Sequence, residues 1–373
     1  MNSIDFHKKY KGKLGVSLKV PLENKEDLSL AYTPGVAEVS KLLHEQPKEA
    51  SNVSLKGNTV AVVSDGSAVL GLGNIGPYGA LPVMEGKAVL FKKFGDVDAF
   101  PICLNTQDNE EIIKIVKAIA PNFGGINLED IAAPRCFEIE RRLIEELDIP
   151  VMHDDQHGTA VVVLAALINS LKIVNKDKEN IKVVVNGAGA AGIAVTELLL
   201  EYGVKNIILC DTKGSIYQGR EELNSEKLII AEKTNLEKLK GELFEIMKST
   251  DVFIGLSKGN LLTSEMVKSM NTDSIIFAMA NPVPEIMPDI AKDAGAKVVA
   301  TGRSDFDNQI NNVLAFPGIF RGALDNKVKV ITNEMLIKAA VNLSKVVEEP
   351  TVDKIIPSPF EVEVVKAVAS AIQ

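Results

Sequence analysis

The chain has 373 residues, of which 46 % are hydrophobic and 24 % charged, and its formal net charge is −9. This length accommodates two domains, each with its own core. An acidic chain is a poor partner for nucleic acid, because phosphates bind basic surfaces. We find no signal peptide and no uninterrupted apolar run long enough to cross a bilayer, so we expect a cytoplasmic protein that does not bind membranes.

Short β-branched segments alternate with helical patterns along most of the sequence. The segments that read as strands are residues 59–64, 181–187, 206–211, 251–257, 274–281 and 297–302. This alternation predicts βαβ units, and therefore an α/β fold with largely parallel sheets covered by helices.

The apolar segment at residues 158–176 predicts a long helix, and we place a domain boundary at its start. An N-terminal α/β domain then covers residues 1–157. A Rossmann-type domain with a doubly wound parallel sheet covers residues 158–373. We expect the C-terminal helices, from about residue 345 to 373, to pack back on the first domain.

Two stretches match the pattern G-x-G-x-x-G. The first, GLGNIG at residues 71–76, is followed by Pro77, and no acid closes the next strand. A lone match of this kind is weak. This loop is equally compatible with a turn that serves a substrate anion or the nicotinamide and with a purely structural turn.

The second stretch, GAGAAG at residues 187–192, stands between a β-branched strand and an Ala- and Leu-rich helix. The next strand ends in Asp211, where a dinucleotide fold holds a ribose hydroxyl. This context predicts a dinucleotide site at a helix N-terminus. Asp211 favours NAD over NADP, although Lys213 weakens that preference. The residues of the loop assigned to the cofactor are Gly187, Gly189, Ala190 and Gly192.

The segment HDDQH at residues 153–157 imitates the zinc-binding pattern H-E-x-x-H. Pro150 and an apolar run precede it, so we place the motif at the end of a strand and not within a helix. His153 and His157 then need not share a face, and no third ligand of similar quality is available. We expect both histidines to be structural, each bonded to a partner.

Two acidic pairs follow predicted strands. Glu129 and Asp130 come after GGINL, and Asp154 and Asp155 come after the apolar run at Val151. Open α/β sheets bind ligands at this end of their strands, and a set of carboxylates suits Mg²⁺ or Mn²⁺. The first domain would then hold the metal and the substrate. A helix cap beside a solvated pair explains the same residues equally well.

Two further residues are candidates for proton transfer. Lys87 lies among apolar residues, and desolvation can lower the pKa of a lysine into the range of a general base. A lysine whose stem packs on the surface is the alternative. Tyr32 precedes Thr33 and Pro34, which mark a helix start; a tyrosine at such a place is more often part of a core.

Together these segments resemble the malic enzymes, specifically the short, single-module bacterial and archaeal type. The resemblance covers nearly the whole chain. The segments that carry it are AYTPGVA, SDGSAVLGLGNIGPYG, PVMEGKAVLFKKFG, INLEDIAAPRCFEIE, HDDQHGTA, NGAGAAG, FAMANPVPEI and NNVLAFPGIFRGALD. It implies oxidative decarboxylation of L-malate to pyruvate and CO₂, with NAD or NADP and with Mg²⁺ or Mn²⁺, in a homodimer or a higher homo-oligomer.

The resemblance also implies roles for single residues. Tyr32 matches the general acid, Lys87 the general base, and Asp154 a proton relay to that lysine. The implied metal ligands are Glu129, Asp130 and Asp155. The implied asparagines near the substrate and the nicotinamide are Asn281 and Asn312.

One position departs from the family pattern. Larger members carry an arginine for the substrate carboxylate where this chain has Ala68. Candidates to replace it are Ser67, the backbone of residues 71–76, Asn281 and Asn312.

Two other functions are alternatives for this sequence. A decarboxylase that converts malate to lactate with bound NAD needs the same groups, and release of NADH distinguishes the two. A non-catalytic dinucleotide-sensing protein would not need Tyr32, Lys87 and four carboxylates.

Overall fold

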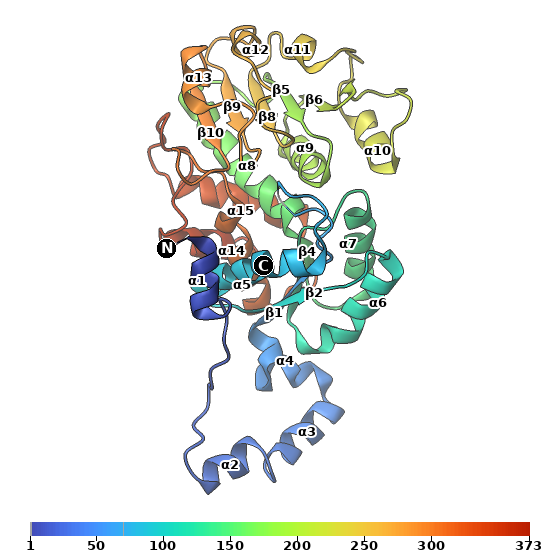
Figure 1. Ribbon diagram of the computed structural model, residues 1–373, viewed down its shortest axis with the longest axis vertical. Helices are drawn as coiled ribbons and strands as arrows, with labels where there is room; N and C mark the ends of the chain where they lie inside the picture. The colour runs from blue at the N-terminus through green and yellow to red at the C-terminus, as the bar shows by residue number, and fades with distance from the viewer. Residues whose placement is uncertain (1, 70) are drawn as a thin grey trace.

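The computed structural model describes residues 2–69 and 71–373, which form two parallel-sheet layers stacked along the long axis (Figure 1). The first sheet has the strand order β2-β1-β3-β4, and all of its pairs are parallel. Its strands are β1 (Thr59–Ser64), β2 (Asp98–Cys103), β3 (Gly125–Leu128) and β4 (Val151–His153).

The second sheet has the order β10-β9-β8-β5-β6-β7, in which only β7 runs antiparallel. Its strands are β5 (Lys182–Asn186), β6 (Asn206–Asp211), β7 (Gly214–Ser215), β8 (Val252–Gly255), β9 (Ile275–Ala278) and β10 (Val298–Thr301). The chain winds from β5 to β6 in one direction and resumes with β8 on the other side. This is the reversal at which doubly wound sheets bind dinucleotides, and the predicted α/β fold is confirmed.

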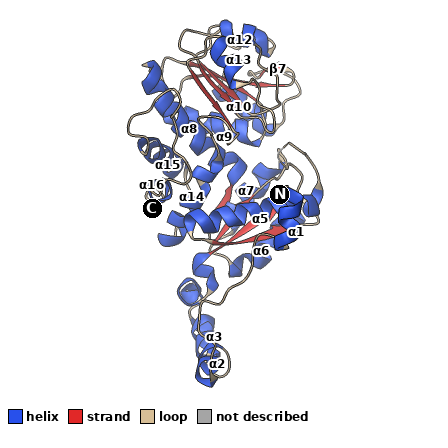
Figure 2. Cartoon of the chain, turned by 60° about the vertical axis from the view of Figure 1, so that its left-hand side comes forward, coloured by secondary structure: helices blue, strands red, loops and turns tan. Residues whose placement is uncertain are grey.

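Helices cover both sheets, as Figure 2 shows. Those of the first half are α1 (Ser3–Tyr10), α2 (Lys25–Ala31), α3 (Val36–Glu45), α4 (Ala50–Val53), α5 (Gly76–Gly95), α6 (Asn109–Ile119) and α7 (Arg135–Glu146). Those of the second half are α8 (Asp154–Val174), α9 (Ala190–Tyr202), α10 (Ser225–Lys233), α11 (Leu243–Ile246), α12 (Ser264–Lys268), α13 (Pro288–Asp293), α14 (Phe316–Asp325), α15 (Asn333–Lys345) and α16 (Glu363–Ala369).

The side chains of β1 alternate between two cores. Val60 and Val62 face the core formed with α5 and α14, whereas Ala61 and Val63 face the core formed with α6 and α7. Period-two alternation in a strand covered on both faces produces this division. α14 comes late in the chain yet packs on α5, with the rings of Phe91 and Phe316 4.7 Å apart.

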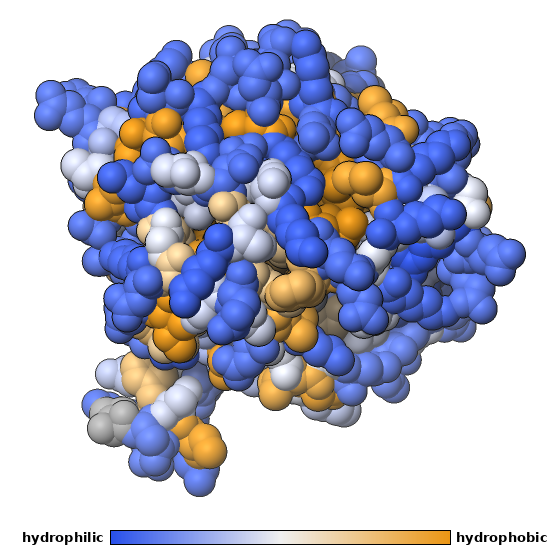
Figure 3. All heavy atoms as spheres, turned by 90° about the horizontal axis from the view of Figure 1, so that it is seen from above, coloured by the Kyte–Doolittle hydropathy of each residue, from blue (hydrophilic) through white to orange (hydrophobic). Residues whose placement is uncertain are grey.

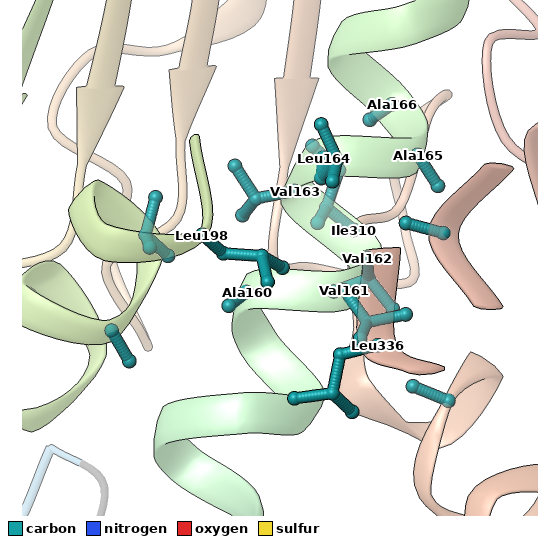
Figure 4. Close-up of a cluster of buried hydrophobic side chains, with 14 of the residues drawn as sticks. Ala160, Val161, Val162, Val163, Leu164, Ala165, Ala166, Leu198, Ile310 and Leu336 are labelled. Carbon is teal, nitrogen blue, oxygen red and sulfur yellow. The ribbon is translucent and has the colours of Figure 1, made fainter. Parts of the chain in front are cut away.

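Helix α8 joins the two layers and lies inside the molecule, against α9 and α15. Figure 4 shows its residues Ala160–Ala166 packed with Leu198, Ile310 and Leu336. Contrary to the expectation from sequence, this helix is long and apolar enough to cross a membrane, but 72 % of its most apolar window is buried in the protein. Burial in the core accounts for its composition.

Residues 20–46, which we call the arm, project from the body beneath the first sheet and carry α2 and α3 (Figures 1 and 2). Neither helix has a buried residue. Exposed apolar residues of the arm include Leu22, Leu28, Leu30 and Tyr32. By contrast, hydrophilic side chains predominate on the face at the opposite end of the molecule, where hydrophobic ones form small patches (Figure 3).

Candidate active site

Strands of both sheets direct their carboxyl ends into one cavity of about 780 Å³. Residues that follow β3 and β4 line it from the first sheet, and residues that follow β5, β8, β9 and β10 line it from the second. Polar residues of the lining include Lys13, Lys87, Glu129, Asp130, Asp155, Ser257, Asn281, Asn311 and Asn312. A cavity at this place in an open α/β sheet is the usual site for a ligand.

The predicted metal ligands meet in this cavity. Glu129, Asp130 and Asp155 each offer an oxygen, and these oxygens lie within 4.8 Å of one another. The amide of Asp130 donates to Asp155 Oδ2 at 2.8 Å, while the buried Asp130 Oδ2 has no hydrogen-bond partner among the residues that the structure describes. A buried, unpaired carboxylate oxygen is costly unless a cation neutralises it, so these residues fit a hard divalent ion.

The charges of the cluster reinforce this conclusion. Burial, and then the charges of Asp155 and Glu129, raises the pKa of Asp130 to about 9. Burial raises the pKa of Asp155 to about 6 even though the ammonium of Lys87 opposes the change. The carboxylates are therefore poorly stabilised as anions by the protein alone, and a bound cation would supply the missing charge.

Lys87 and Asp154 form a buried pair beside the cluster. Lys87 Nζ lies 2.5 Å from Asp154 Oδ2, 2.9 Å from Glu129 Oε1 and 4.2 Å from the ring centre of Phe316. Burial lowers the pKa of Lys87, but the attraction of Asp154 and Glu129 outweighs it, so the pKa is raised overall. The expectation of a lowered pKa is therefore wrong for the protein without a metal. Burial raises the pKa of Asp154 to about 7.

The HDDQH segment spans the junction of β4 and α8. β4 ends at His153 and α8 begins at Asp154, so Asp154 to His157 form the first turn of a helix. The prediction that the motif lies at the end of a strand holds for His153, but it was wrong for the four residues that follow, which belong to the helix. Gly158 completes this turn, since a Cβ there would lie 1.8 Å from Asp154 Oδ1. The glycine leaves room for the carboxylate that pairs with Lys87.

The two histidines differ in their surroundings. His157 Nε2 lies 3.0 Å from Glu140 Oε1, and this contact confirms the expected partner. Among the described residues, neither ring nitrogen of His153 has a hydrogen-bond partner, which corrects the expectation for it, although Nε2 lies 3.5 Å from Asp155 Oδ2. Burial lowers the pKa of His153 to about 4. The Nε2 atoms of the two histidines lie beside different carboxylates, Asp155 for His153 and Glu140 for His157, and neither histidine belongs to the cluster of possible metal ligands among the described residues, which is not the zinc-protease pattern.

The second glycine-rich loop joins β5 to α9. Gly187 has φ +125°, and a Cβ there would lie 2.5 Å from Leu256 O, in the loop after β8. A Cβ on Gly192 would lie 1.7 Å from Gly187 O. Gly189 caps α9 with open space around it, and Ala190 begins the helix. The first and last glycines thus permit the tight turn, and the middle one leaves space for a phosphate at the helix N-terminus.

Asp211 ends β6 as predicted, but its carboxylate is already engaged. Arg220 and Lys227 donate to its two oxygens, each at 2.7 Å, while Lys213 pairs with Glu222 instead. These hydrogen bonds lower the pKa of Asp211 although burial acts to raise it. Sequence reasoning missed both cations, because they lie on a loop and a helix that follow the strand and match no motif.

The candidates for the substrate carboxylate separate into two groups. Asn281, Asn312 and Gly71 of the first glycine-rich loop line the cavity. Ser67 does not line it, because its hydroxyl donates to Asp65 at 2.6 Å and accepts from the amide of Ala132 at 2.9 Å. The structure therefore does not place Ser67 in the cavity lining with the other candidates. Gly71 also packs against the loop after β9, so a structural role for its turn is equally well supported.

The structure does not bring Tyr32 to the cavity of its own chain. It follows α2 on the arm, with 67 % of its surface exposed, and it is not part of the cavity lining. Lining residues that the sequence analysis did not name include Lys13, Ser257 and Asn311. No sequence motif surrounds Lys13.

Comparison with known proteins agrees with this geometry. Residues 11–144 match the family model "Malic enzyme, N-terminal domain", and residues 156–373 match "Malic enzyme, NAD binding domain". The chain is 57 % identical to a bifunctional malic/malolactic enzyme of Bacillus subtilis, over 99 % of this chain and 91 % of that one. It is 58 % identical to an NAD-dependent malic enzyme of Geobacillus stearothermophilus, over 97 % and 76 %. The crystal structure of an NAD-dependent malic enzyme from Thermotoga maritima superposes with a TM-score of 0.97 at 53 % identity, covering 100 % of this chain and 99 % of that one.

Proposed function

This chain belongs to the malic enzyme family and catalyses oxidative decarboxylation of malate with NAD or NADP; we propose that its acidic cluster and the Lys87–Asp154 pair carry out the chemistry. The observation that carries the proposal is the position of the cluster. Two buried carboxylates, a third that is partly exposed, and a buried lysine face the same cavity as the dinucleotide loop. A dehydrogenase that only oxidises an alcohol would not need this group of charges.

We assign Glu129, Asp130 and Asp155 to a Mg²⁺ or Mn²⁺ ion, because they are the described carboxylates that converge in the cavity. When bound, the ion would supply positive charge at the C2 oxygen of the substrate, and the dinucleotide would accept the hydride from C2. Asn281 and Asn312 line the same cavity, and we assign them to orienting the substrate.

Proton transfer uses the Lys87–Asp154 pair. Lys87 passes a proton to Asp154 across 2.5 Å and then takes the proton of the C2 hydroxyl. Without a metal the pKa of Lys87 is raised, so this transfer would depend on a bound cation, whose positive charge would lower that pKa. After oxidation the C3–C4 bond breaks and CO₂ leaves. C3 then needs a proton, and we assign its delivery to Tyr32.

The tyrosine must come from a second copy of the chain if it is the acid. The arm presents exposed Leu28, Leu30 and Tyr32 and has no buried residue in its helices. Apolar side chains exposed on a projecting segment indicate an interface. We therefore propose a homodimer in which each arm completes the cavity of the other chain.

We also propose that the protein is cytoplasmic. Three free cysteines, Cys103, Cys136 and Cys210, suit a reducing compartment such as the cytoplasm. The charge of −9 and the buried position of α8 support a protein that binds neither nucleic acid nor membrane.

A product balance tests the proposal. Purified protein is incubated with L-malate, NAD⁺ and Mn²⁺, and NADH, CO₂, pyruvate and lactate are quantified with and without EDTA. Equal NADH, CO₂ and pyruvate, all lost with EDTA, support it. CO₂ with lactate and no net NADH supports the malolactic activity that the name of the Bacillus subtilis relative includes. NADH with oxaloacetate and no CO₂ refutes the decarboxylase.

A further inference from the structure

The cavity is short of positive charge for an anionic substrate. Among the described residues of its lining, the cationic ones are Lys13 and Lys87. Lys87 is 7 % exposed and is held by Asp154 and Glu129, so its charge is already balanced. A divalent cation does not balance the three carboxylates assigned to it, and a malate dianion would add further negative charge. Lys13 is the one cation of this lining that remains available.

The backbone brings Lys13 close to α5, the helix that carries Lys87. Lys11 ends α1 in the left-handed region, and Gly12 follows with φ +104°, where a Cβ would lie 3.1 Å from a carboxylate oxygen of Glu85 on α5. Lys13 Nζ donates to Pro82 O, also on α5, at 2.6 Å. It lies 3.8 Å from the position of a Cβ on Gly86, the residue before Lys87.

The ammonium of Lys13 retains donor capacity. Pro82 O occupies one of its three N–H groups, and no carboxylate of the described residues forms an ion pair with it, although Lys19 and Lys87 nearby both have such partners. Lys13 as a whole is half-buried, and the hydrogen bond of its ammonium to Pro82 O is exposed to solvent. An ammonium held by one carbonyl at the wall of a ligand cavity is ready to bind an anion.

We propose that Lys13 binds the C1 carboxylate of the substrate, the position for which Ala68 offers no charge. This inference rests on the proposed function. C1 is chosen over C4 because C4 leaves as CO₂. A cation on the C4 carboxylate would stabilise the charge that must be lost, whereas the C1 carboxylate keeps its charge from malate to pyruvate.

The test compares Lys13→Ala and Lys13→Arg with the wild type in two assays. Loss of a charge-assisted hydrogen bond should raise KM for L-malate by about 10- to 100-fold, with kcat and KM for NAD changed far less. Pyruvate retains only the C1 carboxylate, so its dissociation constant, measured by calorimetry with Mn²⁺, should rise by a similar factor. Lys13→Arg should recover most of the affinity in both assays.

Lys8→Ala is the matched control, since Lys8 is an exposed lysine of α1 in which the same charge is removed. It should leave both constants unchanged, and equal melting temperatures should show that the variants are folded. A loss of malate affinity without loss of pyruvate affinity would overturn the C1 assignment. An active enzyme with unchanged constants in Lys13→Ala would overturn the role of Lys13. A wild type that does not convert malate would instead refute the proposed function.

Discussion

At the end of β6, cations hold both oxygens of the Asp211 carboxylate. Arg220 lies on the loop after β7 and also donates to Gly214 O and Ser215 O, whereas Lys227 comes from the first turn of α10. An acid at this place accepts the ribose hydroxyls of NAD and repels the 2′-phosphate of NADP. Two cations on that acid oppose the repulsion, so the residue alone does not exclude NADP.

Removing one of these cations should shift cofactor preference toward NAD. Lys227→Ala frees one oxygen of Asp211 and removes positive charge near the ribose. We expect the ratio of kcat/KM for NAD to that for NADP to rise about five- to tenfold. Lys233→Ala, which changes an exposed lysine of the same helix, is the control. An unchanged ratio in Lys227→Ala would show that specificity is set elsewhere.

The sequence predicts some of these residues well and others not at all. Glu129, Asp130 and Asp155 follow neighbouring parallel strands, whose carboxyl ends must meet at one edge, so their convergence follows from the strand pattern. The contact of Lys13 with Pro82 spans 69 residues. It depends on how α1 docks on α5, and no local pattern encodes that docking.

At the scale of elements, the start of α8 brings Asp154 and Asp155 close to the acidic residues that follow β3. The pKa of Asp155 is about 6, that of Asp154 about 7 and that of Asp130 about 9. Each is above the value of an unfolded chain, so the folded state retains protons that the unfolded state releases. Without metal, the contribution of these three carboxyls to stability is therefore largest in acid and is lost as pH rises through these values.

We expect the melting temperature in EDTA to fall from pH 5 to pH 8, and Mn²⁺ to reverse most of the fall because it binds the anionic form. Asp130→Asn should flatten the dependence in EDTA, whereas Asp293→Asn, at an exposed position of α13, should retain it. Differential scanning calorimetry measures both. A melting temperature in EDTA that is constant or rises over this range would contradict the assignment.

The position of the arm could not be predicted from the sequence of its helices. Its helices carry local signals, such as the Asn24 side chain that accepts from the amides of Glu26 and Asp27 at the start of α2. These signals predict where a helix begins but not where it packs. Tyr32 was therefore assigned to the site by resemblance, while the fold of one chain places it on a projecting segment.

At the scale of the whole molecule, one complete site would take Lys87 from one chain and Tyr32 from the arm of the other. Lys87→Ala and Tyr32→Phe should each be nearly inactive alone. Mixed chains should regain about a quarter of the wild-type activity, since half of the dimers are mixed and each holds one intact site. Activity after unfolding and refolding the two variants together measures this. Wild-type activity in Tyr32→Phe alone would contradict an arm that acts on the other chain. A mixture of the two variants that stays inactive would also contradict it.

One cation bound by the carboxylates should serve both oxidation and decarboxylation. The most direct measurement is the amount of CO₂ and NADH formed from L-malate as Mn²⁺ is titrated into chelator-treated protein. We predict that both products rise together, with one half-saturation point and in equal amounts. NADH that forms at full rate without Mn²⁺ while oxaloacetate accumulates would contradict the claim.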